Sequence, residues 1–224
     1  CYRTEPDPGL NGRALNWPRG KVLGGSSSIN GLLYVRGQPQ DFDQWRQLGN
    51  PGWAWDDGMP LFRRAENWEG EPSVVRGTGG SLNVSESRVQ RPVIDAWVEA
   101  AAGLGYKRND DYNGEDQEGV GHFQMTMRNG RRCSSATAFL KPARGRSNLQ
   151  IFTGAKTLGL IMEGRRAAGI RVRRGNEEIE VRARREVVLS AGSLGSPHIL
   201  MLSGIGAGAE LSAHGIKVVH DLSG

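Results

Sequence analysis

The sequence predicts an α/β fold with an α+β second part, and two patterns in its last third carry this prediction. Residues 169–173 and 178–182 alternate apolar with charged side chains around a glycine turn, which predicts an antiparallel hairpin with one face in water. Residues 187–189 are continuously apolar, as in a strand that is buried on both faces. They run into the small residues 190–192 and an apolar helix, and this succession is typical of a nucleotide-binding sheet.

Three helices are expected ahead of that sheet. One follows Pro39, a second begins with Asp56 as its N-cap, and the third covers residues 92–102 and ends at glycines. The first 38 residues are rich in glycine, proline, asparagine and serine, and are expected to be mostly loop. The side chains expected on the apolar faces of the helices are Phe42, Trp45, Leu61, Phe62, Ala65, Ile94, Trp97, Val98 and Ala101.

Two further strands are expected, at residues 149–153 and 215–219. Residues 204–209 nominally match the glycine pattern of dinucleotide-binding proteins. They follow a helix and not a strand, so the required context is missing and a loop is expected there.

Composition and charge exclude several classes of function. The chain has 224 residues, of which 37% are hydrophobic and 24% charged, as in ordinary globular proteins. It holds no apolar run long enough for a membrane span. The net charge of +5 comes from arginines interleaved with acids, which argues against nucleic-acid binding. The two cysteines, Cys1 and Cys133, have no disulfide or metal spacing and favour a reducing, cytoplasmic location.

The stretch Gly24–Gly31 is the most informative for chemistry. Its two leading glycines allow a ligand to approach the backbone, and three serines follow. If these serines open a helix, their amides form an anion site that suits a phosphate ester or a pyrophosphate. The alternative is a flexible linker, but the apolar residues Ile29 and Leu32–Tyr34 argue against one.

A second stretch, residues 190–197, has small residues at the end of the expected buried strand. It suits either a ligand crossing the sheet edge or tight packing of helix on strand, and the residues favour neither. Five carboxylates between residues 110 and 118 do not have the spacing of a calcium loop, so a solvated surface is expected. Neither a metal site nor a catalytic triad is indicated by the four histidines, which are His122, His198, His214 and His220.

Two long segments resemble the signatures of the glucose–methanol–choline (GMC) flavoprotein oxidoreductases. The first comprises Pro18–Gly31, Tyr34–Gly37 and Asp41–Asp43, and the second runs from Gly192 to Pro197 and then from Leu202 to Gly206. Shorter matches between them are Arg63–Asn67, Asn129–Arg132 and Leu140–Ala143. The resemblance spans almost the whole chain in the right order, and the nearest subgroup is the choline dehydrogenases and related bacterial alcohol dehydrogenases.

This resemblance implies a partial FAD-binding nucleotide domain with part of a substrate domain on an antiparallel sheet. It divides the chain into a first FAD-binding part (1–68), a substrate or cap region (69–146) and a second FAD-binding part (147–224). The family's N-terminal GxGxxG unit would precede Cys1, and its catalytic histidine would follow Gly224. The chain is therefore expected to be an internal fragment that has no catalytic base and is inactive in isolation.

The resemblance also implies the cofactor, FAD, and the residues that contact it. Val22 and the Gly25-Ser26 turn would lie along FAD, and residues 30–33 would reach its flavin side. Thr157 would provide a backbone contact to the adenine. FAD would be bound non-covalently, because Ile29 stands where some relatives attach it through a histidine. The residues expected to bind FAD are Val22, Gly25, Ser26, Asn30, Gly31, Leu32, Leu33, Thr157, Ala191 and Gly192.

The implied reaction is the oxidation of a small-molecule alcohol. A histidine outside the chain would take the hydroxyl proton, and hydride would pass from carbon to the flavin. The sequence indicates neither the electron acceptor nor the oligomeric state. Two alternatives stay open: a FAD-containing hydroxynitrile lyase of the same family, and a non-catalytic truncated module that binds nothing tightly.

Overall fold

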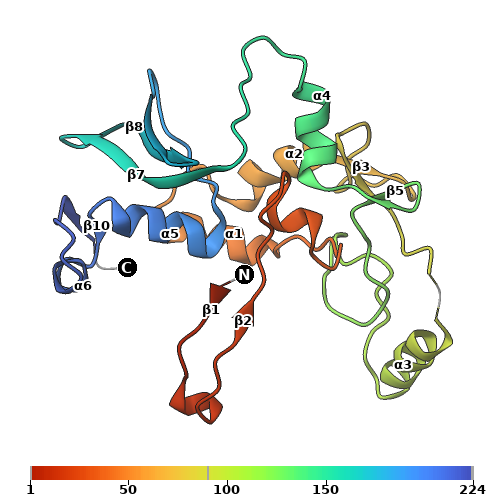
Figure 1. The fold of residues 1–224 in the computed structure, drawn as a ribbon. Coiled ribbons are helices and arrows are strands. Elements are labelled where there is room, and N and C mark those ends of the chain that lie inside the picture. The colour runs from red at the N-terminus through yellow and green to blue at the C-terminus, as the bar shows by residue number, and fades with distance from the viewer. Residues whose placement is uncertain (1, 90, 223–224) are drawn as a thin grey trace. The chain divides into compact units, whose positions relative to one another are not determined.

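The structure is a computed structural model that describes residues 2–89 and 91–222. It divides into two compact units, Cys1–Leu149 and Gln150–Gly224 (Figure 1). The three-part division expected from the resemblance stays a prediction.

The first unit begins with short elements joined by loops, as expected for residues 1–38. Strands β1 (Tyr2–Arg3) and β2 (Asn16–Trp17) pair antiparallel. Two 3₁₀ helices lie in the same region, η1 (Pro8–Leu10) and η2 (Gly25–Ser28).

The three expected helices are confirmed as α1 (Pro39–Gln47), α2 (Trp55–Ala65) and α3 (Pro92–Gly103). The predicted N-cap of the second helix is wrong. The N-cap is Ala54, whose amide donates to Asp57 Oδ2 at 3.0 Å, so Asp56 lies inside the first turn. The helix begins earlier because the carboxylate of Asp57 reaches back from the third helical position to the free amide.

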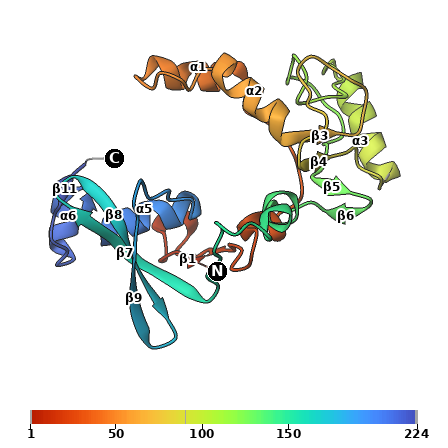
Figure 2. The same cartoon turned by 90° about the horizontal axis from the view of Figure 1, so that it is seen from above.

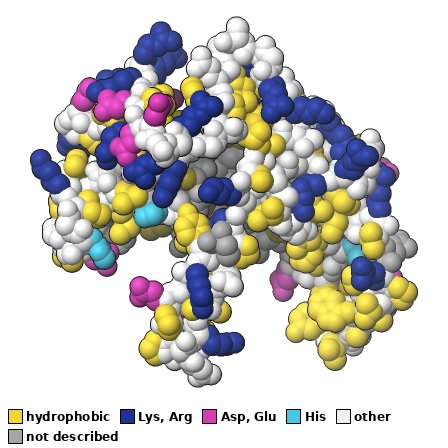
Figure 3. Space-filling model, in the orientation of Figure 1, with side chains coloured by type: hydrophobic (Ala, Val, Ile, Leu, Met, Phe, Trp, Pro, Cys, Tyr) yellow, Lys and Arg dark blue, Asp and Glu magenta, His cyan; other side chains and the backbone are white. Residues whose placement is uncertain are grey.

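The apolar faces of these helices are buried only in part. Phe42 of α1 contacts Trp55 and Phe62 of α2, with ring centroids 5.6 Å apart in each pair, so these two helices pack through aromatic side chains. On α3, Val98 is 5% exposed but Trp97 is 62% exposed, which corrects the prediction for Trp97. Figure 3 shows the apolar side chains gathered on the surface at the position of α3. The reason is that the described residues supply a neighbour to only one side of this helix.

Short strands complete the first unit. Strand β3 (Glu66–Trp68) pairs parallel with β4 (Leu82–Val84), and β5 (Met127–Arg128) pairs antiparallel with β6 (Arg131–Arg132). A π-helix, η3 (Ala136–Leu140), continues into the short helix α4 (Lys141–Ala143). The apolar core of the unit includes Trp68, Val84, Val98, Val120, Cys133 and Ala138.

A buried ion cluster stands beside this core. Glu66 accepts from Arg36 at 2.5 Å and from Arg76 at 2.8 Å, and all three side chains are at most 2% exposed. Arg76 also pairs with Asp111 at 2.6 Å, so this carboxylate departs from the solvated surface expected for the acidic segment. Asp111 is recruited because the guanidinium of Arg76 has donors left over after it binds Glu66.

The second unit is a three-stranded antiparallel sheet with helices beside it. Its strands β7 (Ala155–Glu163), β8 (Arg166–Arg174) and β9 (Glu177–Arg182) lie in chain order, which confirms the predicted hairpin. Helix α5 (Gly192–Leu202) contacts β7, and the amide of Leu160 donates to Ser203 Oγ at 2.7 Å. Figure 2 shows the sheet and α5 together.

Three strand predictions in or next to the second unit are wrong. Residues 149–153 are not a strand, and the strand that follows them, β7, begins at Ala155. Residues 187–189 form no strand, and Val188 is 74% exposed. No described strand offers these residues a ladder of hydrogen bonds, and an apolar run without such a partner cannot form a sheet. Residues 215–219 also form no strand, since β11 (His220–Asp221) follows them.

The expected loop at residues 204–209 is likewise wrong. Strand β10 (Ile205–Gly206) pairs parallel with β11, and helix α6 (Gly208–Ala213) starts directly afterwards. Both depend on Asp221, because its backbone belongs to β11 and its Oδ1 accepts from the amide of Gly208 at 2.7 Å. None of the helices in the described part of the chain has the length and apolar character that a membrane crossing requires.

Candidate functional site

The two glycines that begin the Gly24–Gly31 stretch have different surroundings. Both have positive φ, +89° at Gly24 and +55° at Gly25. A Cβ on Gly24 would lie 2.5 Å from Ser28 Oγ and 3.1 Å from Ala136 Cβ, whereas a Cβ on Gly25 would meet nothing within 4 Å. Gly24 therefore serves the packing of the loop, and Gly25 has open space beside its backbone.

The side-chain hydroxyls of the serines in this stretch form hydrogen bonds within the protein. Ser26 Oγ accepts from the amide of Gly20 at 3.2 Å, and Ser28 Oγ donates to the carbonyl of Leu23 at 2.9 Å. Ser27 Oγ lies 3.0 Å from Ser135 Oγ and accepts from the Ser135 amide at 2.9 Å. They form a single 3₁₀ turn, η2, and not the start of an α-helix. Their hydroxyls thus stabilise the loop.

The residues that follow are held by a segment about a hundred positions further along the chain. Arg132 donates to the carbonyl of Ser27 at 3.0 Å, to Asn30 Oδ1 at 2.6 Å and to the Asn30 carbonyl at 2.8 Å. Thr126 donates to the carbonyl of Leu32 through its amide at 2.8 Å and its hydroxyl at 3.1 Å. These bonds stabilise Leu32 at a φ of +70°, which a residue with a branched side chain rarely adopts.

Several apolar side chains in and beside the stretch are exposed. Val22, Ile29 and Leu33 are each half exposed or more, and Asn30 and Gly31 are exposed as well. Exposed apolar side chains close together in a folded unit mark a surface that a ligand or another part of the protein covers.

Tyr34 and Arg36 are the polar residues next to this stretch. Arg36 Nε donates to the Tyr34 hydroxyl at 3.3 Å, and Arg36 is bound in turn to Glu66 of the buried ion cluster. Burial raises the pKa of the Tyr34 phenol above its usual value, and the neighbouring guanidinium of Arg36 opposes this only in part. Tyr34 is therefore a neutral phenol at physiological pH.

The other predicted site residues lie in the second unit. Thr157 pairs with Val172 across β7 and β8 and is half-buried. Ala191 is the N-cap of α5, and its amide donates to Ser196 Oγ at 3.0 Å. Gly192 has a φ of +86°, and a Cβ on it would meet nothing within 4 Å. The structure brings Val22, Gly25, Ser26, Asn30, Gly31, Leu32 and Leu33 together in the first unit, and Thr157, Ala191 and Gly192 belong to the second.

Of the four histidines, His122 has a partner that the sequence did not indicate. Its Nε2 lies 2.9 Å from Asp95 Oδ1 of α3, and both side chains are about half exposed. His198 lies in α5, His214 follows α6, and His220 lies in β11. In the range that the structure describes, no group of three His, Cys, Asp or Glu residues is placed to hold a metal ion.

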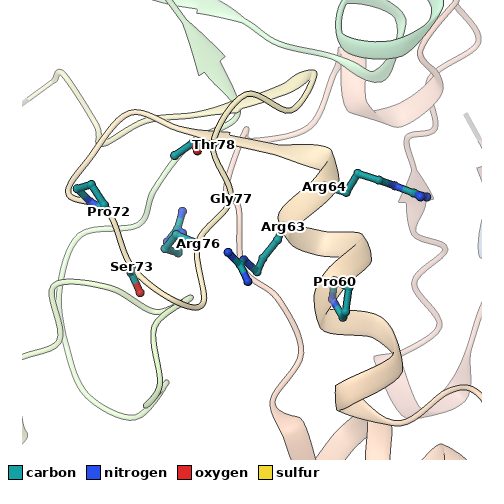
Figure 4. Close-up of a pocket in the computed structure, with 8 residues that line it drawn as sticks. All are labelled: Pro60, Arg63, Arg64, Pro72, Ser73, Arg76, Gly77 and Thr78. Carbon is teal, nitrogen blue, oxygen red and sulfur yellow. The ribbon is translucent and has the colours of Figure 1, made fainter.

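A cavity of about 390 Å³ opens in the first unit between α2 and residues 72–78 (Figure 4). Arg63 points from α2 toward Arg76, whereas Arg64 points away from the loop. The guanidinium of Arg76 is already bound to Glu66 and Asp111. This cavity contains none of the residues predicted to bind FAD, so it is separate from the Gly24–Gly31 stretch.

Comparison with known proteins shows the family to which the chain belongs. The family model of the GMC oxidoreductases matches residues 8–219. The chain belongs to the GMC oxidoreductase family. Membership of this family, with FAD-dependent relatives, implies FAD as the cofactor.

Curated relatives include the oxygen-dependent choline dehydrogenases of Brucella anthropi and Sinorhizobium fredii, each 48% identical over 223 residues. These alignments cover 100% of this chain and 40% of each relative, so the chain spans well under half of their length.

Solved structures of the family share the fold. Pyridoxine 4-oxidase from Mesorbium loti matches with a TM-score of 0.91 and 38% identity, over 98% of this chain and 44% of that one. A FAD-dependent oxidoreductase from Chaetomium thermophilum matches with a TM-score of 0.91 and 30% identity, over 99% and 41%. The GMC fold class and the resemblance on which it was predicted are therefore confirmed.

Sequence reasoning missed the residues that hold the stretch in place, Arg132, Ser135 and Thr126. The Asn129–Arg132 segment matched the family pattern, but a match does not show what an arginine binds. Their partners lie about a hundred residues away in sequence, and only the folded chain brings them together.

Proposed function

We propose that this chain is part of a longer FAD-dependent oxidoreductase, here called the parent protein, that oxidises the CH–OH group of a small alcohol. The observation that supports this most directly is the open space at the Cα of Gly25, in a segment with exposed apolar side chains that the family model covers. The chain's similarity to choline dehydrogenases supports choline, or an alcohol like it, as the substrate.

The described residues fit a bound FAD. Gly25 combines a positive φ with open space where a Cβ would stand, so a large planar or phosphorylated group can approach its Cα. Val22 and Leu33 provide apolar contact area, and the exposed amide group of Asn30 provides a polar contact. In the second unit, Gly192 combines a positive φ with open space in the same way. Because Ile29 cannot form a bond to the cofactor, we propose that FAD is bound non-covalently.

FAD, when bound, supplies the acceptor for the hydride that leaves the alcohol carbon. This chain's residues bind and orient it. The Gly24–Gly31 stretch sets the backbone that faces the cofactor, and Thr126 holds the carbonyl of Leu32 just after it. Tyr34 stays neutral and adds no charge to the segment. Among the described residues, His122 pairs with Asp95 and none of the four histidines has the histidine or asparagine partner expected for the general base, so we place that base in the rest of the parent protein.

Two alternatives are less well supported. A hydroxynitrile lyase would keep FAD without redox chemistry, but the relatives reported above are dehydrogenases and oxidases. A truncated module that binds nothing tightly would not need the open space at the Cα of Gly25. A cytoplasmic location, the electron acceptor and the oligomeric state stay predictions or open questions of the parent protein.

The test is to purify the parent protein and add choline under anaerobic conditions. We expect a flavin absorbance spectrum that bleaches when choline or a related primary alcohol is added. Protein that carries no flavin, or flavin that no alcohol reduces, would contradict the proposal. The 224-residue chain with excess FAD should show no dye-linked turnover, because loss of a general base alone costs about 10²–10⁴ in rate.

A further inference from the structure

Asn30 contributes an exposed polar side chain at the end of the stretch that is expected to face the flavin, and its orientation is determined by two donors. Arg132 donates to Oδ1 at 2.6 Å, and the amide of Leu32 donates to the same oxygen at 3.1 Å. An amide whose oxygen receives two N–H groups cannot rotate by 180° without placing donor against donor.

The other end of the Asn30 amide group is unused. Its Nδ2 has no hydrogen-bond partner in the part of the chain that the structure describes, and the residue is exposed. The two Nδ2 hydrogens are therefore available to an acceptor atom outside this chain's own fold.

Arg132 is suited to hold this orientation. Its guanidinium binds the Asn30 side chain, the Asn30 carbonyl and the Ser27 carbonyl at once, so the group is held at three points. In the described residues it forms no ion pair with a carboxylate, and its charge-assisted hydrogen bonds all go to this stretch. Its neighbour Arg131 is exposed and, among the residues that the structure describes, has no side-chain partner.

We propose that Arg132 is a positioning residue that orients Asn30 so that Nδ2 donates a hydrogen bond to an acceptor atom of FAD. This rests on the proposed function, since it requires FAD at the Gly24–Gly31 stretch. It assigns the Asn30 side chain a donor role and gives Arg132 an effect on the cofactor without direct contact.

The decisive variant is Asn30→Asp in the parent protein. Aspartate keeps the oxygen that Arg132 and the Leu32 amide bind, and it replaces the Nδ2 donor with an acceptor. We expect the melting temperature of the FAD-free protein to be unchanged or higher, because the pair with Arg132 becomes charged. We expect the Kd for FAD to rise at least about 10-fold, because the cofactor's acceptor then faces an oxygen.

Arg132→Met and Arg132→Lys test the positioning role. Methionine removes the guanidinium and should raise the Kd for FAD about 10-fold and alter the visible circular dichroism of bound flavin. Lysine keeps the charge but not the three-point contact, so its Kd should be intermediate. Arg131→Met is the matched control and should leave both measurements unchanged.

A double-mutant cycle separates positioning from general stabilisation. If Arg132 acts through Asn30, the double variant Asn30→Ala/Arg132→Met should bind FAD within about 3-fold of Asn30→Ala. Three results would each overturn the inference. The first is that the effects of the two single variants on the Kd for FAD multiply in the double variant. The others are wild-type FAD affinity of Asn30→Asp, and equal behaviour of Arg132→Met and Arg131→Met. If the wild-type parent protein itself binds no FAD, the proposed function fails instead.

Discussion

Two small-residue stretches of this chain look alike in sequence but differ in structure. Gly24–Gly31 in the first unit is held by hydrogen bonds from residues 126–135, so its backbone conformation is defined within this chain. The run before Gly192 in the second unit has no strand partner among the described residues, and Val188 is exposed there. The difference shows that a glycine-rich segment needs long-range hydrogen-bond partners, as well as its glycines, to adopt a defined conformation. Where such partners are present, the loop adopts a defined backbone conformation. Where they are absent, a sequence with the pattern of a buried strand forms no sheet.

The largest expected effect is on the stability of the first unit, and it concerns Glu66. Glu66→Gln leaves Arg36 and Arg76 buried without their shared carboxylate, which should cost about 3–5 kcal/mol of unfolding free energy. Urea unfolding of the parent protein measures this cost.

The matched control for Glu66 lies on the second unit's hairpin. Glu178 pairs with Arg173 at 2.6 Å, but both side chains are half exposed. Glu178→Gln should therefore change stability by less than about 1 kcal/mol. Equal losses from the two variants would show that the buried cluster does not stabilise the first unit.

The next effect sharpens the difference between Gly24 and Gly25. Gly25→Val should raise the Kd for FAD at least about 100-fold, because its side chain fills the open space and strains a φ of +55°. Gly24→Ala should instead lower the melting temperature of the FAD-free protein, because its Cβ would meet Ser28 and Ala136. FAD titration and thermal unfolding of both variants separate the two roles. Full flavin retention by Gly25→Val would remove Gly25 from the cofactor site.

The smallest effect concerns Val188. In the 224-residue chain, Val188→Asp should change the unfolding free energy by less than about 0.5 kcal/mol, because the side chain is 74% exposed. In the parent protein the same substitution should cost about 2–3 kcal/mol or more, if residues 187–189 form the buried strand that their sequence predicts. Similar values in both proteins would mean that the apolar run is not a sheet strand in either.

Local patterns in the sequence were sufficient for the helices and the hairpin. Pro39 and Pro92 start α1 and α3, and alternation of apolar and charged residues produces the β8–β9 hairpin. These elements form from contacts within a few residues, where propensity, capping and periodicity act. The residue patterns, together with the family resemblance, also predict which segments bind FAD, and this stays a prediction.

What only the tertiary structure decided is which residues hold those segments and which strands find partners. Arg132 reaches Asn30, and Arg36 reaches Glu66, across long stretches of chain. Asp221 follows β10 and α6 in sequence, yet it pairs with β10 and accepts a hydrogen bond at the start of α6. Such pairings depend on how the chain closes on itself, because a hydrogen bond between distant residues leaves no periodic trace in the sequence around either one.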